Sequence, residues 1–334
     1  MINLAINGFG RIGRLAFRIG LDYPENLRIV AINTSGKIGL SGWAHLLRYD
    51  TTYGKYEKEV KTEKGGFVID NIHYPVLGEK DPAKLPWQKY EVDVVLEATG
   101  IFRNYEGANA HLKAGAKKVL ISAPAKSENI PTYLAGVNLK KYHGEKIIDG
   151  GSCTTNCAAP VLRVLLEKFG IKKAFLTTIH AYTSDQRVQD GSHRDLRRGR
   201  AAAQNIVPTS TGAIKAIIKT LPELAGKLEG LAIRVPVLVG SLLDLSLILE
   251  KEATVSVINQ VFIQAANSEL KEILATTNEP LVSSDIIANP HSAIVDLERT
   301  QLINSNFAKI IAWYDNEWAS AQRLIETAIY IGRR

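Results

Sequence analysis

The sequence predicts an α/β protein with two domains, a doubly wound parallel sheet followed by an α+β domain with a mostly antiparallel sheet. Short apolar strands alternate with helical segments over residues 1–151, which is typical of parallel βαβ units. Beyond residue 169 the strands become longer and more isolated, and a length of 334 residues also favours two domains. We expect a first domain at residues 1–151 and a second at 152–316. An amphipathic helix within residues 317–334 is expected to pack back on the first domain.

The first domain opens with a strand, a glycine-rich turn, a helix and a second strand. We predict these elements at Asn3–Asn7, Arg11–Leu21 and Leu27–Asn33, with the pattern G-x-G-x-x-G at residues 8–13. In this context the pattern predicts a dinucleotide site, because glycines allow a tight turn and the helix N-terminus attracts a pyrophosphate. A βαβ unit that binds nothing is the alternative. The later elements predicted for this sheet are the strands Val92–Leu96, Val119–Ile121 and Ile147–Asp149 and the helix Asn104–Ala114.

The segment Ser152–Cys157 reads Ser-Cys-Thr-Thr-Asn-Cys and holds the two cysteines of the chain. It follows two glycines and leads into a helical stretch that ends at Phe169, so Cys153 is expected at the start of a helix. The helix dipole and unpaired N–H groups favour a thiolate there. Hydroxyls of Ser152, Thr154 and Thr155 add donors for an anion beside the sulfur. A buried structural thiol is the alternative, and a disulfide within one helical turn has poor geometry.

The second domain contains a histidine at the end of a strand and a long basic loop. His180 closes the strand 175–180 and is a candidate base for a cysteine nucleophile, although it could also be a structural histidine. The polar stretch Ser184–Asn205 is too long for a plain connection. The other predicted elements are the strands Ala174–Thr178, Leu242–Leu249 and Ala308–Trp313 and the helices Gly212–Thr220 and Thr254–Asn267.

Composition excludes several classes of protein. No apolar run approaches the roughly 20 residues of a membrane span, and the N-terminus lacks a signal pattern. Two cysteines favour a reducing cytoplasm, and no Cys or His cluster has zinc spacing, so no metal site is expected. The net charge is +7, and residues 193–200 form the densest basic block. That block has no interleaved aromatics, so a phosphate-bearing small molecule or a subunit contact explains it as well as nucleic acid does.

Cys153, His180 and a dinucleotide fingerprint together favour one reaction. A thiolate attacks an aldehyde, the hemithioacetal gives a hydride to a nicotinamide, and a second nucleophile cleaves the thioester. With these residues in place, the chain resembles phosphorylating glyceraldehyde-3-phosphate dehydrogenases over essentially its full length. The segments that carry the resemblance are Ala5–Arg14, Ser152–Cys157, His180–Thr183, Pro208–Ala213 and Trp313–Trp318.

The resemblance implies a reaction and an assembly. The expected reaction converts D-glyceraldehyde 3-phosphate, inorganic phosphate and NAD or NADP to 1,3-bisphosphoglycerate, in glycolysis or gluconeogenesis. The expected assembly is a cytoplasmic homotetramer. Cys153 matches the nucleophile and His180 the base. The residues that match phosphate ligands are Thr183 and Arg234 for the substrate, and Ser152, Thr154, Thr211, Gly212 and Arg198 for inorganic phosphate or a further phosphate contact. The residues that match cofactor contacts are Gly8, Gly10, Arg11, Ile12, Lys80, Ser122 and Asn316.

Two departures from the family pattern concern the cofactor. Thr34, followed by Ser35, stands where NAD-binding relatives carry an aspartate for the ribose, and Lys37 is close by in sequence. Gly191 and Ser192 replace a Leu-Pro pair. Both changes predict that NADP is accepted, in addition to NAD or in preference to it. Ala319-Ser320 also replaces a Gly-Tyr pair, with an effect on turnover that the sequence leaves open.

Two other functions remain as alternatives. Erythrose-4-phosphate dehydrogenase shares the fold and nucleophile, but it departs from the phosphate-site pattern that is intact here at Thr209–Gly212. An inactive nucleotide- or RNA-binding relative would not need Cys153, His180 and Arg234 together.

Overall fold

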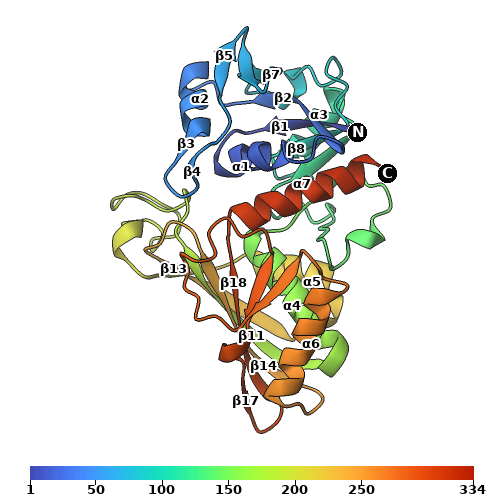
Figure 1. Ribbon diagram of the computed structural model, residues 1–334, viewed down its shortest axis with the longest axis vertical. Coiled ribbons are helices and arrows are strands. Elements are labelled where there is room, and N and C mark those ends of the chain that lie inside the picture. Colours follow the sequence, from blue (N-terminus) through green and yellow to red (C-terminus); the bar gives the residue numbers. More distant parts are fainter. The chain divides into compact units, whose positions relative to one another are not determined.

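The computed structural model describes residues 1–334, which form two compact units. The first unit is Met1–Gly151 together with Ala321–Arg334, and the second is Ser152–Ser320. The C-terminal helix α7 (Trp318–Gly332) therefore contributes most of its length to the first unit (Figure 1). Within that unit Leu324 and Ile325 lie close to Gly150 and Gly20.

The first unit is built on an eight-stranded sheet in the order β10-β9-β8-β1-β2-β7-β6-β5. The pairs from β10 to β7 are parallel, as the predicted βαβ pattern requires. Its strands are β1 (Ile2–Asn7), β2 (Leu27–Asn33), β5 (Lys61–Glu63), β6 (Gly66–Ile69), β7 (Ile72–Leu77), β8 (Val94–Glu97), β9 (Lys118–Ile121) and β10 (Ile147–Asp149). The remaining elements of this unit are the helices α1 (Arg11–Gly20), α2 (Leu40–Arg48) and α3 (Tyr105–Lys113), the 3-10 turns η1 (Pro82–Lys84) and η2 (Leu139–Lys141), and the hairpin β3 (Tyr49–Asp50) with β4 (Gly54–Lys55).

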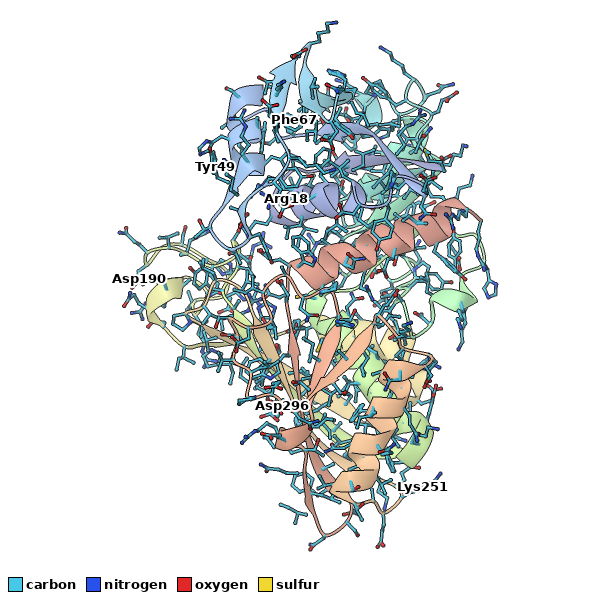
Figure 2. The ribbon with its side chains drawn as sticks, viewed as in Figure 1. Arg18, Tyr49, Phe67, Asp190, Lys251 and Asp296 are labelled. Atoms are coloured by element: carbon cyan, nitrogen blue, oxygen red, sulfur yellow. The ribbon has the colours of Figure 1, made fainter.

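An antiparallel extension, β5 to β7, lengthens this sheet beyond the predicted strands. Strands β6 and β7 are joined by Asp70 and Asn71, and both residues have positive φ. A two-residue loop of this kind matches the twist of a hairpin, and Asp and Asn tolerate the conformation. Phe67 on β6 packs with Phe9 and Phe17 in the buried aromatic core of the unit (Figure 2).

The second unit is built on a sheet in the order β12-β13-β11-β14-β18-β16-β15, with β17 paired to β18. The pairs β11/β13 and β15/β16 are parallel, and the others are antiparallel. Its strands are β11 (Ile171–Ala181), β12 (Val207–Thr209), β13 (Leu228–Val235), β14 (Ser241–Leu249), β15 (Leu274–Thr277), β16 (Ala293–Asp296), β17 (Gln301–Ile303) and β18 (Phe307–Tyr314). The helical elements are α4 (Cys153–Phe169), α5 (Ala213–Thr220) and α6 (Val255–Asn267), and the 3-10 turns η3 (Ala202–Gln204), η4 (Pro222–Leu224) and η5 (Leu297–Arg299).

Helix α4 is the centre of the second unit. It contacts β11, β14, β16 and β18 and lies beside α5 and α6 (Figure 1). Strand β14 alternates between fully and partly buried residues along its length, as expected for a sheet with one face covered by helices. The predicted fold class, a doubly wound parallel sheet plus a mostly antiparallel α+β domain, is therefore confirmed. None of the helices combines the length and the apolar character that crossing a membrane would need.

Candidate active site

Cys153 is the first residue of helix α4, as its sequence context predicted. Ser152 is the N-cap: its Oγ accepts a hydrogen bond from the N–H of Thr155 (3.1 Å), and the Thr155 Oγ1 accepts one from the N–H of Ser152 (3.2 Å). This reciprocal capping box fixes the first turn of the helix and with it the thiol. The Thr155 hydroxyl is thus part of the cap rather than a donor held open for an anion.

His180 lies next to the thiol. Its Nε2 is 3.3 Å from the Cys153 Sγ, and its Nδ1 is 2.6 Å from the carbonyl oxygen of Ala181. Because that carbonyl can only accept, Nδ1 carries the proton in the neutral ring and the Nε2 lone pair faces the sulfur. The pair therefore has the geometry of a nucleophile with its base.

The electrostatics of this pair differ from the expected thiolate. Burial raises the pKa of the Cys153 thiol, although Arg234 and hydrogen bonds from Thr154 oppose the rise. Burial also lowers the pKa of His180 to about 3, and the positive charge of Arg234 adds to this effect. Burial disfavours the charged form of each group, so both shifts favour a neutral thiol beside a neutral imidazole, which is the base form of His180.

Tyr314, at the end of β18, holds three parts of the site together. Its buried hydroxyl is 2.9 Å from the Thr154 Oγ1 and 2.7 Å from the Thr178 Oγ1, and its ring meets that of His180 edge-on. It therefore ties the first turn of α4 to β11. No role for Tyr314 was predicted, because the sequence around a tyrosine at a strand end does not indicate what its hydroxyl contacts. The Thr154 hydroxyl thus contacts Tyr314, and a hydrogen bond from the same side chain acts on the Cys153 thiol and lowers its pKa.

Arg234 and Thr183 lie together close to the Cys–His pair. Strand β13 runs parallel to β11 and places Arg234 opposite His180. The Arg234 Nη1 donates to the Thr183 Oγ1 (3.0 Å) and to the carbonyl of Ala181 (3.2 Å). Its Nε is buried and makes no hydrogen bond within the protein. A buried, unused N–H on a guanidinium that has only neutral partners suits an anionic ligand.

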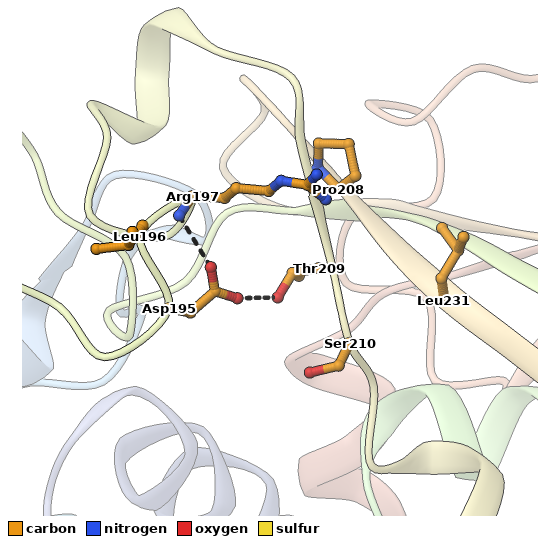
Figure 3. A pocket seen from close by; sticks show the side chains of 7 residues that line it. All are labelled: Asp195, Leu196, Arg197, Pro208, Thr209, Ser210 and Leu231. Carbon is orange, nitrogen blue, oxygen red and sulfur yellow. Dashed lines mark hydrogen bonds between the residues drawn. The ribbon is translucent and has the colours of Figure 1, made fainter.

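Arg198 has charged surroundings instead. Its Nη1 donates to the Asp185 Oδ2 (2.5 Å), its Nε to the Thr209 Oγ1 (2.9 Å) and its Nη2 to the carbonyl of Ser210 (2.9 Å). Nearby, a pocket of about 480 Å³ is lined by Asp195, Leu196, Arg197, Pro208, Thr209, Ser210 and Leu231 (Figure 3).

Thr211 and Gly212 stand at the start of helix α5. The Thr211 Oγ1 accepts a hydrogen bond from the N–H of Ala213 (3.2 Å). Gly212 is the N-cap, has no side-chain cap, and has no atom within 4 Å of the position a Cβ would take. The backbone at this helix start is therefore accessible to a ligand, which favours an anion.

The glycine turn of the first unit fits a dinucleotide. Gly8 has a φ of +101°, and a Cβ there would lie 2.7 Å from the backbone of Ala98. A Cβ on Gly13 would lie 1.9 Å from the carbonyl oxygen of Gly8. Gly10, the N-cap of α1, has nothing within 4 Å of its Cβ position. Two glycines thus allow close packing, and the third leaves the N–H groups of Arg11 and Ile12 open to a pyrophosphate.

Residues predicted to contact the adenosine occupy different environments. Thr34 is buried, and its Oγ1 donates to the carbonyl of Leu77 (3.0 Å) and accepts from the N–H of Gly36 (3.3 Å). The Ser35 Oγ accepts from the N–H of Lys37 (3.3 Å) and keeps its own proton to donate. Lys80 is exposed, and Ser122 is half-buried with its N–H bonded to the carbonyl of Glu97.

Ser192 and Asn316, the other two predicted cofactor contacts, belong to the second unit. Ser192 is exposed, and its carbonyl accepts from the Nε of Arg187 (2.9 Å). The Asn316 Oδ1 accepts from the N–H of Gly240 (3.2 Å) and the hydroxyl of Ser241 (2.9 Å). These two bonds fix the amide so that its NH₂ group remains to contact a carboxamide.

A buried polar network at the end of the parallel strands was not predicted. The Nε1 of Trp87 donates to the His111 Nδ1 (2.9 Å), so the Nε2 of a neutral His111 carries the proton and faces the Glu97 Oε2 (3.1 Å). Asn7 donates to the same carboxylate oxygen (2.5 Å) and accepts from the Nδ2 of Asn33 (2.7 Å). These residues link the carboxyl ends of β1, β2 and β8. Each looks like an ordinary polar residue in the sequence, and only the sheet order brings them together.

The fold and the site define a class of protein, a dehydrogenase with a dinucleotide-binding domain and a second domain that carries a cysteine–histidine pair. Comparison with known proteins then identifies the family. Residues 2–105 match the sequence model of the glyceraldehyde 3-phosphate dehydrogenase NAD binding domain, and residues 152–316 match that of the C-terminal domain. The chain therefore belongs to the glyceraldehyde-3-phosphate dehydrogenase family, and it is an oxidoreductase with an NAD-binding domain.

Relatives match along the whole chain. Glyceraldehyde-3-phosphate dehydrogenase 2 of Streptomyces avermitilis is 46% identical over 335 residues, which cover 100% of this chain and 99% of the relative. Glyceraldehyde-3-phosphate dehydrogenase 2 of Bacillus subtilis is 44% identical over 335 residues, covering 100% and 97%. Glyceraldehyde-3-phosphate dehydrogenase A, chloroplastic, of Scenedesmus vacuolatus is 49% identical over 316 residues, covering 93% and 100%.

Proposed function

We propose that the protein converts D-glyceraldehyde 3-phosphate, inorganic phosphate and NAD(P)⁺ to 1,3-bisphosphoglycerate and NAD(P)H. The observation that supports this most is the Cys153–His180 pair with Arg234 beside it. A thiol can become the nucleophile, a neutral imidazole can take its proton, and an arginine with an unused N–H can hold a phosphate. The names of the relatives favour this substrate over erythrose 4-phosphate.

The first step is addition of the thiol to the aldehyde. The Cys153 Sγ bonds to the carbonyl carbon while its proton passes to the His180 Nε2, 3.3 Å away. The carbonyl oxygen gains the negative charge, which the N–H of Cys153 at the start of α4 can stabilise. The protonated His180 then returns its proton to this oxygen, which gives the hemithioacetal and leaves His180 neutral. Arg234 and Thr183 hold the phosphate of the substrate, which keeps the carbonyl carbon near the sulfur.

The second half of the reaction forms and cleaves a thioester on Cys153. The bound nicotinamide supplies the group that takes the hydride, while His180 takes the hydroxyl proton of the hemithioacetal. An oxygen of inorganic phosphate then attacks the thioester carbon, and the Cys153 sulfur leaves as a thiolate. We assign Ser152, Thr211, Gly212 and Arg198 to the attacking phosphate, with Thr154, whose hydroxyl already contacts Tyr314. Asn316 orients the carboxamide of the cofactor.

We further propose that the enzyme uses NADP well, although its family establishes NAD binding. A carboxylate at position 34 would repel a 2′-phosphate, and Thr34 carries none. The Thr34 hydroxyl proton is already donated to Leu77, so Ser35, Lys37 and Ser192 are the better candidates to donate to the phosphate.

Kinetics with both cofactors test this proposal. The variant Thr34→Asp should lower kcat/KM for NADP about tenfold or more relative to NAD, because a carboxylate accepts from a ribose hydroxyl and repels a phosphate. Ser35→Ala should lower kcat/KM for NADP and spare that for NAD. A wild-type enzyme with much higher kcat/KM for NAD would disprove the NADP proposal.

We propose a cytoplasmic homotetramer that serves glycolysis in the oxidative direction and gluconeogenesis in the reductive one. The loop of residues 184–205 carries large apolar side chains on its surface, with Val188 88% and Leu196 84% exposed. A second copy of the chain would cover them, as the family resemblance implies. Analytical ultracentrifugation of the full chain would test the number of subunits.

Absorbance assays of NAD(P)H test the activity itself. We expect turnover of the triose phosphate that requires added phosphate or arsenate and is abolished by iodoacetate. Cys153→Ser should lower kcat by several orders of magnitude. Turnover without phosphate, or RNA binding without turnover, would contradict the proposed reaction.

A further inference from the structure

The guanidinium of Arg198 is paired with carboxylates of its own chain. Asp185 accepts from Nη1, and the Asp195 Oδ2 lies 3.5 Å from Nε and accepts from the Thr209 hydroxyl (2.6 Å). Thr209 in turn accepts from the same Nε. Two carboxylates therefore stand around one cation that is expected to bind an anion.

Both carboxylates are held in the ionised form. Burial acts to raise the pKa of Asp185, but hydrogen bonds and charge from Arg198, with His193, outweigh it and hold the pKa below its ordinary value. The hydrogen bond from Thr209 lowers the pKa of Asp195, with further help from the N–H groups of Arg197 and Arg198. The two carboxylates therefore offset the positive charge of Arg198 at neutral pH, which weakens its attraction for phosphate.

Asp185 has a second partner beside it. The His193 Nδ1 lies 2.9 Å from both the backbone nitrogen and the carbonyl oxygen of Asp195. Its Nε2 lies 3.6 Å from the Asp185 Oδ1. A carboxylate displaced from Arg198 would thus stay beside the polar ring of His193 rather than meet an apolar surface.

We propose that Asp185 is a specificity-determining residue for inorganic phosphate, because it competes with the anion for the guanidinium of Arg198. This inference rests on the proposed role of Arg198 in binding phosphate. Arriving phosphate displaces the Asp185 carboxylate from Arg198. The binding free energy of phosphate is therefore the difference between the free energies of the Arg198–phosphate and Arg198–Asp185 ion pairs. The competition keeps the affinity low, and low affinity lets phosphate enter after the thioester forms and lets the acyl phosphate leave.

The variant Asp185→Asn tests the proposal in the full-length enzyme. Initial rates are measured against inorganic phosphate at saturating aldehyde and cofactor. KM for phosphate should fall about three- to tenfold, the effect expected when one partly exposed charge near the site is removed. KM for the aldehyde should stay within about twofold, since Arg234 and not Arg198 holds the phosphate of that substrate.

Asp190→Asn is the matched control. Asp190 lies in the same loop and pairs with Arg200 (2.8 Å), so its substitution removes the same charge from the same segment (Figure 2). It should leave KM for phosphate within about twofold of wild type, if position and not net charge decides the effect. Equal decreases in the two variants would overturn the proposal.

An unchanged or higher KM for phosphate in Asp185→Asn would also overturn it. Should that variant fail to fold, Asp185→Ser gives the same comparison, with the same decrease expected. The wild-type enzyme distinguishes failure of the proposed reaction from failure of the Asp185 proposal. Turnover that does not depend on phosphate would contradict the proposed reaction. Phosphate-dependent turnover that Asp185→Asn leaves unchanged would contradict only the competition between Asp185 and phosphate.

Discussion

Arg234 and Arg198 are both proposed to bind anions, but the groups around them differ in charge. Arg234 donates to a hydroxyl and a carbonyl and keeps a buried Nε without a partner in the protein. Arg198 donates to a carboxylate, a hydroxyl and a carbonyl, and a second carboxylate lies 3.5 Å away. The presence of an arginine in a proposed anion site therefore does not by itself predict how strongly the site binds an anion. What it already binds determines how readily it accepts a ligand.

The two arginines also differ in the groups whose pKa they lower, although Arg198 and Asp185 both act on the pKa of Arg234. Arg234 is partly buried close to the thiol, where its charge lowers the pKa of Cys153 and of His180. Arg198 lowers the pKa of Asp185 and Asp195, outside the Cys–His pair. Arg234 thus influences both binding and the chemistry of the thiol, whereas Arg198 is expected to influence binding alone.

The largest effect should come from Arg234→Met. Losing two charge-assisted hydrogen bonds to the substrate should lower kcat/KM for the phosphorylated aldehyde by about 10²–10⁴. Unphosphorylated glyceraldehyde is the matched substrate, and its kcat/KM should fall far less. Alkylation of Cys153 by iodoacetate should also shift to higher pH, because the positive charge that lowers the thiol pKa is gone. Equal losses with both aldehydes would contradict a phosphate-binding role.

The second effect concerns stability in acid. It should come from His180, whose pKa is lowered by burial and by the charge of Arg234. The folded-state pKa of His180 is about 3, below the ordinary 6.5, so the unfolded chain binds more protons between these values. The stability from keeping His180 neutral is complete above pH 6.5 and is lost as the pH falls toward 3.

His180→Asn should remove this dependence. Between about pH 6.5 and pH 3 the wild type should lose roughly 3–5 kcal/mol more unfolding free energy than the variant. Urea unfolding at several pH values measures the difference. Parallel pH curves for the two proteins would show that His180 is not buried in its neutral form.

The smallest of the three effects is expected for Arg198→Gln. Because Arg198 already has carboxylate partners, its net contribution to phosphate binding is small, and KM for phosphate should rise about tenfold or less. Arg200→Gln is the control, since Arg200 is an exposed arginine of the same loop that pairs with Asp190. A larger change in KM for the aldehyde than for phosphate would reverse the assignment of the two sites.

The sequence predicts the parts of this molecule that depend on local pattern. The glycine turn and the position of Cys153 at a helix start follow from residues adjacent in the chain, and both predictions hold. The predicted bounds of the strands also agree closely with the observed ones. Strand Leu27–Asn33 is found as predicted, and β11 extends the predicted strand at both ends. Hydrophobic periodicity and helix capping depend on residues a few positions apart, so both can be recognised in the sequence without knowledge of the fold.

Contacts between segments that are distant in the sequence cannot be predicted from local patterns in the same way. Tyr314 meets Thr154 across 160 residues, and nothing local marks either as the other's partner. Burial also opposes the expected thiolate by raising the pKa of Cys153, and that effect depends on what covers the residue rather than on its place in a helix. Asp185 was absent from the predicted site for the same reason, as its pairing with Arg198 depends on how the loop folds.

The Glu97 network has a consequence for how the first sheet assembles. Glu97, His111 and Asn7 satisfy one another only when β1 and β8 pair with Asn7 opposite Glu97. Sliding one strand by a single residue would separate the Glu97 Oε2 from Asn7, although Thr99 would still donate to Oε1, and a buried carboxylate that lacks a donor costs about 1–3 kcal/mol. Apolar strands of Val, Leu and Ile would tolerate such a slip much better. The buried carboxylate therefore helps to specify the register of β1 and β8, at the edge of the sheet where the cofactor is expected.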